Sequence, residues 1–162
     1  IREWVQGPKI VGEFSRSTVA VVREAAAFFG MDAVQVSAQN HGAHLANLEG
    51  LEVILEIKIG PQGLPFSKMD LEKMAAHVQF FLFDFSQADF SKSTFYAQKD
   101  FWLEMFALRP SLLQADFQAG EWPEVLETFG LAGLSLVGGE EEQVGVKSYD
   151  QMDEIFEAFH HD

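Results

Sequence analysis

The sequence contains no cysteine, which excludes disulfide bonds, thiolate metal ligands and a thiol nucleophile from these 162 residues. Basic residues are also few. The chain has 11 lysines and arginines against 25 aspartates and glutamates, and its formal net charge is -14. Such a negative field repels nucleic acids and anionic lipid surfaces, so we expect neither of them as a partner.

Long apolar runs and cofactor motifs are missing as well. The sequence shows no stretch of about 18 apolar residues and no signal peptide, which predicts no membrane span and a cytoplasmic location. The five histidines lack the spacing of metal ligands, and no glycine-rich GxGxxG turn follows any strand-like run. We therefore expect neither a metal nor another cofactor. The chain opens at Ile1 without an initiator methionine, which suggests a fragment.

Apolar residues, by contrast, are plentiful and regularly spaced. They make up 48% of the chain and include 16 phenylalanines, enough for one globular domain over residues 1–162. Runs typical of strands alternate with stretches that have helical spacing. We expect strands at 8–14, 33–38, 51–59, 78–85, 110–117 and 131–139. We expect helices at 17–30, 41–50, 68–76, 92–108, 121–130 and 148–159.

Six alternating strand and helix units predict a parallel sheet covered by helices. Periodicity alone allows a doubly wound open sheet or most of an eight-unit barrel. Two features favour the barrel: no dinucleotide-binding turn follows a strand, and the opening "IREWVQG" is typical of the end of a helix whose strand is not in the sequence. We therefore predict an α/β domain of the (β/α)8 TIM-barrel type, with six βα units visible and the N-terminal units absent.

Polar residues follow each expected strand. Because parallel strands deliver their carboxyl ends to one edge, these residues should share a single rim. They are Glu13, Ser15, Arg16, Gln35, Ser37, Gln39, Lys58, Asp84, Ser86, Gln87, Gln114, Asp116, Gln118, Gly138, Gly139 and Glu140.

Asp84 ends the most hydrophobic of these strands, "VQFFLFDF". An apolar wall raises the pKa of a carboxyl group by disfavouring its charged form, which would suit Asp84 to act as a general acid. The wall would be formed by Phe80, Phe81, Phe83 and Phe85. The alternative is that Asp84 caps a helix or pairs with a cation.

Cations and glycines near the rim suggest binding groups. Lys58 ends its strand and could face inward, or its ammonium could extend to solvent. Arg16 is a candidate substrate contact or a solvated loop residue. Gly138 and Gly139 could bring backbone N–H groups to a phosphate, although Glu140 and the two glutamates after it would make an ordinary solvated turn equally suitable.

Several segments together resemble the phosphoribosylanthranilate isomerase family, a tryptophan-biosynthesis TIM barrel. "IVGEFSRST" (10–18) is similar to its "VGVF" strand, "FFGMDAVQVSA" (28–38) to "LGLDVVQLHG", and "FFLFDF" (80–85) to "LLLD". "VILEIKI" (53–59) resembles the fifth strand, and "GLSLVGGEEEQVGVKSYDQMDEIFEAF" (133–159) the final unit with "GVDVSSGVE".

The resemblance implies an Amadori rearrangement of a small phosphorylated aminosugar. Asp84 would be the acid that protonates the ribose ring oxygen, and the base would be a cysteine on an upstream strand that this sequence lacks. Lys58, Gln35 and Arg16 would contact the substrate, and Gly138 and Gly139 would take its phosphate. If two units are absent, the exposed seam would invite either a homodimer or disorder.

The sequence departs from the family pattern at several positions. Ala115 and Asp116 replace a glycine pair, Ser37 replaces a histidine, and Ser135 replaces an aspartate. A carboxylate beside the expected phosphate opposes its binding by like-charge repulsion. These departures leave a second reading open, a divergent paralogue that acts as a non-catalytic binding or regulatory module. A third reading is an unrelated barrel or open-sheet enzyme of small-molecule metabolism.

Overall fold

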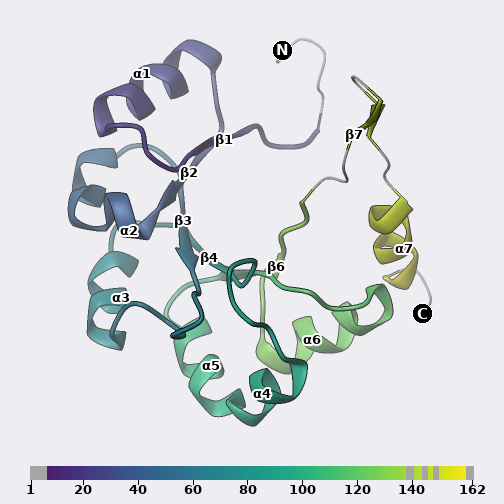
Figure 1. The fold of residues 1–162 in the computed structure, drawn as a ribbon. Coiled ribbons are helices and arrows are strands. Elements are labelled where there is room, and N and C mark those ends of the chain that lie inside the picture. The colour runs from purple at the N-terminus through teal and green to yellow at the C-terminus, as the bar shows by residue number, and fades with distance from the viewer. Residues whose placement is uncertain (1–6, 138–140, 144–145, 148–149, 160–162) are drawn as a thin grey trace.

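Six parallel strands form one sheet in the computed structural model, which describes residues 7–137, 141–143, 146–147 and 150–159. The strands follow one another around an arc in the order in which they occur in the sequence (Figure 1). They are β1 (Val11–Phe14), β2 (Ala33–Ser37), β3 (Val53–Lys58), β4 (Phe80–Asp84), β5 (Ser111–Gln114) and β6 (Gly133–Leu134).

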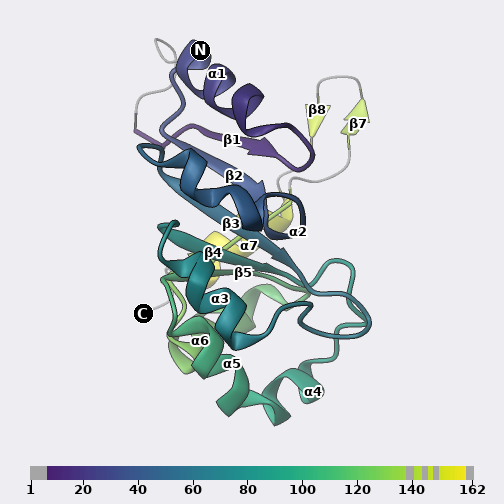
Figure 2. The same ribbon diagram turned by 90° about the vertical axis from the view of Figure 1, so that its left-hand side faces the viewer.

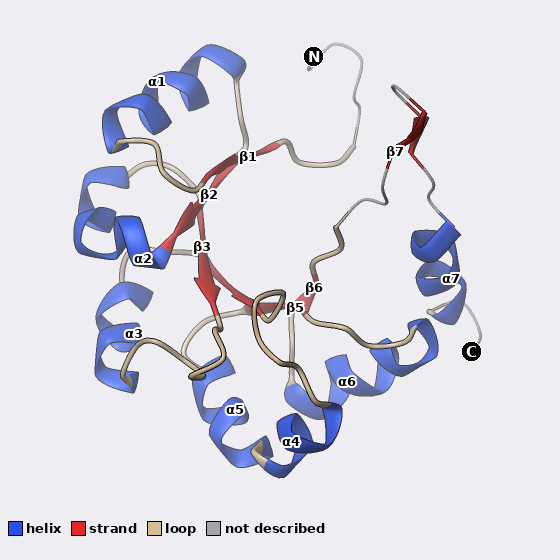
Figure 3. Ribbon diagram, in the orientation of Figure 1, coloured by secondary structure: helices blue, strands red, loops and turns tan. Residues whose placement is uncertain are grey.

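Helices cover the convex side of this arc (Figure 3). The α-helices are α1 (Val19–Phe29), α2 (Ala38–His41), α3 (Lys68–Ala75), α4 (Lys92–Ala97), α5 (Lys99–Phe106), α6 (Trp122–Phe129) and α7 (Asp150–Ala158). Two 3-10 helices, η1 (Gly42–Leu48) and η2 (Ala119–Glu121), adjoin them. In the described part of the chain, none of these helices is both long and apolar enough to cross a bilayer.

The strand order decides between the two architectures that periodicity allows. A doubly wound sheet reverses its strand order, whereas β1 to β6 run consecutively and all in parallel. Figure 2 shows β1 to β5 side by side in this order. The TIM-barrel-like fold is therefore confirmed and the doubly wound alternative is wrong. Within the described residues β1 and β6 are the two edges of the sheet, so the sheet does not close into a full barrel there.

Local sequence signals set the helix ends. The hydroxyl of Thr18 accepts a hydrogen bond from the backbone N–H of Val21 at the start of α1, and Gly30 ends that helix in the left-handed conformation at φ 61. At the start of α3, Ser67 and Asp70 form a reciprocal capping box, and the Ser67 hydroxyl lowers the pKa of the Asp70 carboxyl. These signals explain why α1 and α3 lie close to the expected ranges 17–30 and 68–76.

The core lies between the outer face of the sheet and the helices. Residues at alternate strand positions point to opposite faces, and the outward set includes Leu55, Ile57, Phe81, Phe83 and Leu113, all fully buried. The ring of Phe83 meets that of Phe106 on α5 edge to face, at 5.0 Å between centroids. The apolar half of each strand thus holds the helices in place.

Two expected helices differ in detail, and one hairpin is unexpected. The helix expected over 92–108 is interrupted at Gln98, whose backbone leaves helical angles, and the 3.6-residue apolar period is insensitive to a break of one residue. The helix expected over 41–50 is mainly the 3-10 helix η1. An unexpected antiparallel hairpin, β7 (Glu141–Gln143) and β8 (Val146–Lys147), follows β6, and its glutamates are poor strand formers.

Candidate active site

One row of polar side chains crosses the inner face of the sheet at the carboxyl ends of the strands. Lys58, Asp84 and Gln114 are register partners on β3, β4 and β5. Ser135, just after β6, continues the row, because its Oγ donates to Gln114 Oε1 at 3.1 Å. The prediction that Asp84 and Lys58 lie on the same face and at the same end of the sheet is confirmed.

Asp84 is held through one of its two carboxyl oxygens. Oδ1 accepts hydrogen bonds from the backbone N–H of Ser86 at 2.8 Å and from Gln114 Nε2 at 3.1 Å. Oδ2 makes no hydrogen bond with any described residue. Although Asp84 is only 3% exposed, the chain from Ser135 through Gln114 fixes its orientation and leaves one oxygen available for proton transfer.

Three of the four phenylalanines expected to wall Asp84 do not do so. Phe81, Phe83 and Phe85 belong to the helix-covered core, with Phe83 and Phe85 packed against Trp102. Because strand side chains alternate, neighbours at odd spacing from Asp84 must lie on the other face of the sheet. The expected aromatic wall is therefore wrong, and the polar partners Gln114 and Ser86 surround the carboxyl group instead.

Glu56 is the residue that the sequence reasoning missed. It lies on β3 two positions before Lys58, on the same face, and is only 6% exposed. Its Oε2 is 3.6 Å from Lys58 Nζ, and its Oε1 accepts a hydrogen bond from Gln35 Nε2 at 3.4 Å. The alternation of "VILEIK" carries the signal, since Val53, Leu55 and Ile57 are buried on one face and Glu56 falls on the other.

Burial raises the pKa of the Glu56 carboxyl above its ordinary value. Lys58 opposes this shift as a nearby positive charge, while the carboxylates of Asp84 and Glu13 reinforce it. Two carboxyl groups, Glu56 and Asp84, thus lie close enough to interact but in different surroundings. Such pairs are where acid and base roles separate in enzyme active sites.

Lys58 also faces a pocket of about 480 Å³ at the ends of β1, β2 and β3. Arg16 lines the same pocket, so the structure brings these two predicted substrate contacts together. Gln35 lies deeper on the inner face, where it bonds Glu56. Gly138 and Gly139 fall outside the described residues.

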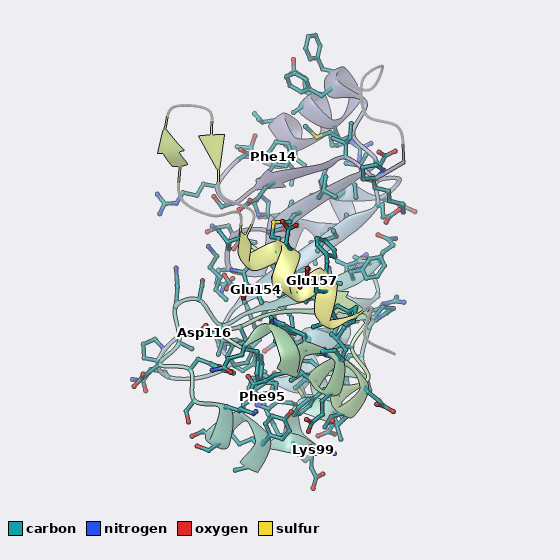
Figure 4. The ribbon with its side chains drawn as sticks, turned by 90° about the vertical axis from the view of Figure 1, so that its right-hand side faces the viewer. Phe14, Phe95, Lys99, Asp116, Glu154 and Glu157 are labelled. Atoms are coloured by element: carbon teal, nitrogen blue, oxygen red, sulfur yellow. The ribbon has the colours of Figure 1, made fainter. Side chains whose placement is uncertain are left out.

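The ends of β5 and β6 carry the opposite charge. Asp116 is exposed and lines a pocket of about 510 Å³ together with Glu154 of α7 (Figure 4). It also lines a second pocket of about 460 Å³ that includes Gln114 and Ser135. No lysine or arginine occurs among the described residues that line either pocket. Asp116 therefore presents an exposed carboxylate at the end of β5.

The acidic groups at this end of the sheet raise the question of a metal-binding arrangement. In the described portion of the chain, no group of three or more histidines, aspartates and glutamates is arranged to hold a metal ion. What the site offers is a pair of carboxyl groups, one ammonium group and several amide side chains. These groups are suited to proton transfer on a polar organic substrate.

Comparison with solved structures finds the same fold in several isomerases. Phosphoribosyl anthranilate isomerase from Thermus thermophilus superposes with a TM-score of 0.69 at 18% identity, over 98% of this chain and 76% of that one. TrpF from Jonesia denitrificans superposes with a TM-score of 0.67 at 15% identity, over 98% of this chain and 74% of that one. No protein-family model matches the chain, and no curated protein matches its sequence.

Two further neighbours carry information about ligands and assembly. One phosphoribosyl anthranilate isomerase, at a TM-score of 0.64 and 16% identity over 97% of this chain and 74% of that one, is in complex with reduced 1-(o-carboxyphenylamino)-1-deoxyribulose 5-phosphate. Another, from Thermotoga maritima, is a monomer generated from a dimeric enzyme. At such identities the likeness establishes the fold, and the chain has the fold of these isomerases.

Proposed function

We propose that this protein is an isomerase of a phosphorylated aminosugar, with N-(5'-phosphoribosyl)anthranilate as the substrate and the Amadori rearrangement as the reaction. The observation that carries the proposal is the anchored carboxyl group of Asp84, which lies at the carboxyl end of β4 beside Lys58. The fold shared with phosphoribosyl anthranilate isomerases supports it. A cytoplasmic location and a homodimer belong to the same proposal.

Asp84 acts as the general acid in this scheme. Its proton passes to the ribose ring oxygen while the bond between that oxygen and C1 breaks, which leaves an iminium group at C1. Gln114 and the Ser86 N–H hold Oδ1, so Oδ2 is the oxygen that meets the substrate. The charge of the iminium is transient and has the Asp84 carboxylate beside it.

Glu56 is the candidate base within this chain. When its carboxylate takes the proton from C2, the C2–H electron pair forms a C1–C2 double bond and the iminium π pair returns to nitrogen. The enolamine then tautomerises to the ketose. One proton leaves Asp84 and one arrives at Glu56, so the step balances. Burial raises the pKa of Glu56 and brings it closer to neutral pH, which makes its carboxylate a stronger base.

Growth of a tryptophan auxotroph that lacks this isomerase tests the proposal. The cell would carry the intact gene, the Asp84→Asn variant or the Asp116→Asn variant. We expect growth with the intact gene and with Asp116→Asn, because Asp116 is exposed and outside the polar row, and no growth with Asp84→Asn. Equal growth with Asp84→Asn would remove Asp84 from the mechanism.

Failure of all three genes, with soluble protein shown in each strain, would reject the isomerase proposal itself. Expression of the protein is therefore checked by immunoblot in every strain. Asp84→Asn retains the size of the side chain and its ability to accept a hydrogen bond from Gln114, so that loss of folding does not imitate loss of the acid.

A further inference from the structure

The pocket at the ends of β1, β2 and β3, here named the β1–β3 pocket, differs in charge from the rest of the molecule. Its side chains include Ser15, Arg16, Ser37, Asn40, Lys58 and Gln87, and a turn over residues 60–65 closes one side. Two of the described lining residues are cations and none is acidic. In a chain with 25 acidic and 11 basic residues, such a concentration of positive charge marks an anion site.

Amide side chains already join the three strand ends around this pocket. Asn40 Nδ2 donates to the Ser15 carbonyl at 2.7 Å, and Gln39 Nε2 donates to the Lys58 carbonyl at 3.1 Å. Ser37 Oγ donates to Gln39 Oε1 at 3.2 Å. These bonds fix the positions from which the two cations extend, so a ligand need not order the pocket when it binds.

The two cations are available to a ligand. Arg16 is exposed and makes no hydrogen bond or ion pair with any described residue. The Lys58 side chain is 33% exposed, and its separation of 3.6 Å from Glu56 is long for a charge-assisted hydrogen bond. Arg16 can present parallel N–H groups to an oxyanion, and Lys58 adds a point charge.

The described residues at the mouth of β5 and β6 include no lysine or arginine among those that line its pockets. Asp116 and Glu154 line its pockets, and a phosphate there would meet like charge from both. The family resemblance predicts the phosphate at that end. The charges of the described residues favour the other end of the rim.

We propose that the β1–β3 pocket binds an oxyanionic group of the substrate, a phosphate or a carboxylate. The identity of the ligand as a substrate rests on the proposed function, because Lys58 joins this pocket to Glu56 and is the register partner of Asp84. The pocket itself does not depend on turnover. An oxyanion held there would place the adjoining sugar along the polar row.

Isothermal titration of the full chain with inorganic phosphate and, separately, with anthranilate tests the pocket at low ionic strength. We expect one or both anions to bind, and Arg16→Gln or Lys58→Gln to weaken binding about tenfold, the effect of losing one charge-assisted contact. Tighter binding of phosphate assigns the pocket to the phosphate, and tighter binding of anthranilate assigns it to the carboxylate. Arg16→Gln changes an exposed side chain and therefore keeps the fold.

Lys99→Gln is the matched control, because it removes one positive charge from the exposed start of α5 (Figure 4). It should leave affinity within about twofold, which is a small free-energy change. The pocket proposal would be overturned by an equal loss of affinity in Lys99→Gln or by unchanged affinity in the Arg16 and Lys58 variants. Failure of both anions to bind would overturn it as well. If the pocket fails this test but the protein is an active isomerase, the proposed function stands and the pocket proposal is rejected. If the protein binds an anion in the pocket but has no isomerase activity, the pocket proposal stands and the proposed function is rejected.

Discussion

The two faces of the same six strands have opposite characters. The outer face is apolar, and its side chains pack against the helices in a continuous core that includes Leu55, Ile57 and Phe83. The inner face carries Glu56, Lys58, Asp84 and Gln114 at alternate positions of those same strands. The contrast teaches that one set of residues stabilises the fold while its immediate sequence neighbours remain available for chemistry.

The polar inner face also lowers the stability of the fold. Glu56 and Asp84 are both buried carboxyl groups, and a buried charge is unfavourable unless it is paired or hydrogen-bonded. Glu56 has Lys58 as a positive neighbour and Gln35 as a hydrogen-bond donor, and one oxygen of Asp84 accepts hydrogen bonds from Gln114 and the Ser86 N–H. Substitutions on the outer face should therefore lower stability through lost packing, and substitutions on the inner face should do so through unpaired buried charge.

The largest loss of stability should come from the outer face. Phe83→Ala removes a fully buried ring that meets Phe106 and Trp102, and should lower the unfolding free energy by about 3–5 kcal/mol. Urea unfolding followed by circular dichroism measures the change. Phe28→Ala is the control, because this ring is 79% exposed on α1 and should change the free energy by about 0.5 kcal/mol or less. Equal effects of the two substitutions would contradict the assignment of the core.

A smaller loss should follow when the cation of the inner face is removed. Lys58→Met leaves Glu56 without its positive partner and should cost roughly 1–3 kcal/mol at pH 7, the penalty of an unpaired buried charge. The cost should disappear near the pH at which Glu56 is protonated. A Lys58→Met and Glu56→Gln double variant should recover most of it, and failure to recover would mean that Lys58 stabilises the fold through its aliphatic stem.

The smallest of these stability effects is a pH dependence from Glu56. Because the folded-state pKa is raised, the protonated form favours folding, and this contribution is lost as pH rises from the ordinary value of 4.5 through the raised value. Glu56→Gln imitates the protonated form. Its stability relative to the unsubstituted protein should therefore increase with pH across that window, as measured by urea unfolding at several pH values. A constant difference would show that burial does not perturb Glu56.

Periodicity in the sequence predicts much of this fold. The alternation of apolar runs gives all six strands of the sheet, and caps such as Thr18 and Gly30 mark the ends of α1. The sequence does not reveal the break at Gln98, because a helical pattern survives one nonhelical residue. The β7 and β8 hairpin also escapes prediction, since its glutamates carry no strand signal.

The sequence predicts the site residues that lie at strand ends. It does not predict the features that depend on which face of the sheet a side chain occupies. Asp84 and Lys58 come together because parallel strands bring their carboxyl ends to one edge. The aromatic wall failed because adjacency in sequence places Phe83 and Phe85 on the opposite face. Glu56 lies within the apolar run of β3 and not at its end, so only its alternation with Leu55 and Ile57 indicates that it occupies the inner face.

Parallel measurement of turnover and stability in purified Asp84→Asn tests the division between the two faces most directly. Isomerisation of N-(5'-phosphoribosyl)anthranilate by the unsubstituted protein should be readily measured, and the variant should lose about 100-fold or more in kcat as expected for a general acid. Its urea midpoint should stay close to that of the unsubstituted protein. Unchanged kcat, or a loss of activity that merely follows a loss of folding, would contradict a chemical role for the inner face.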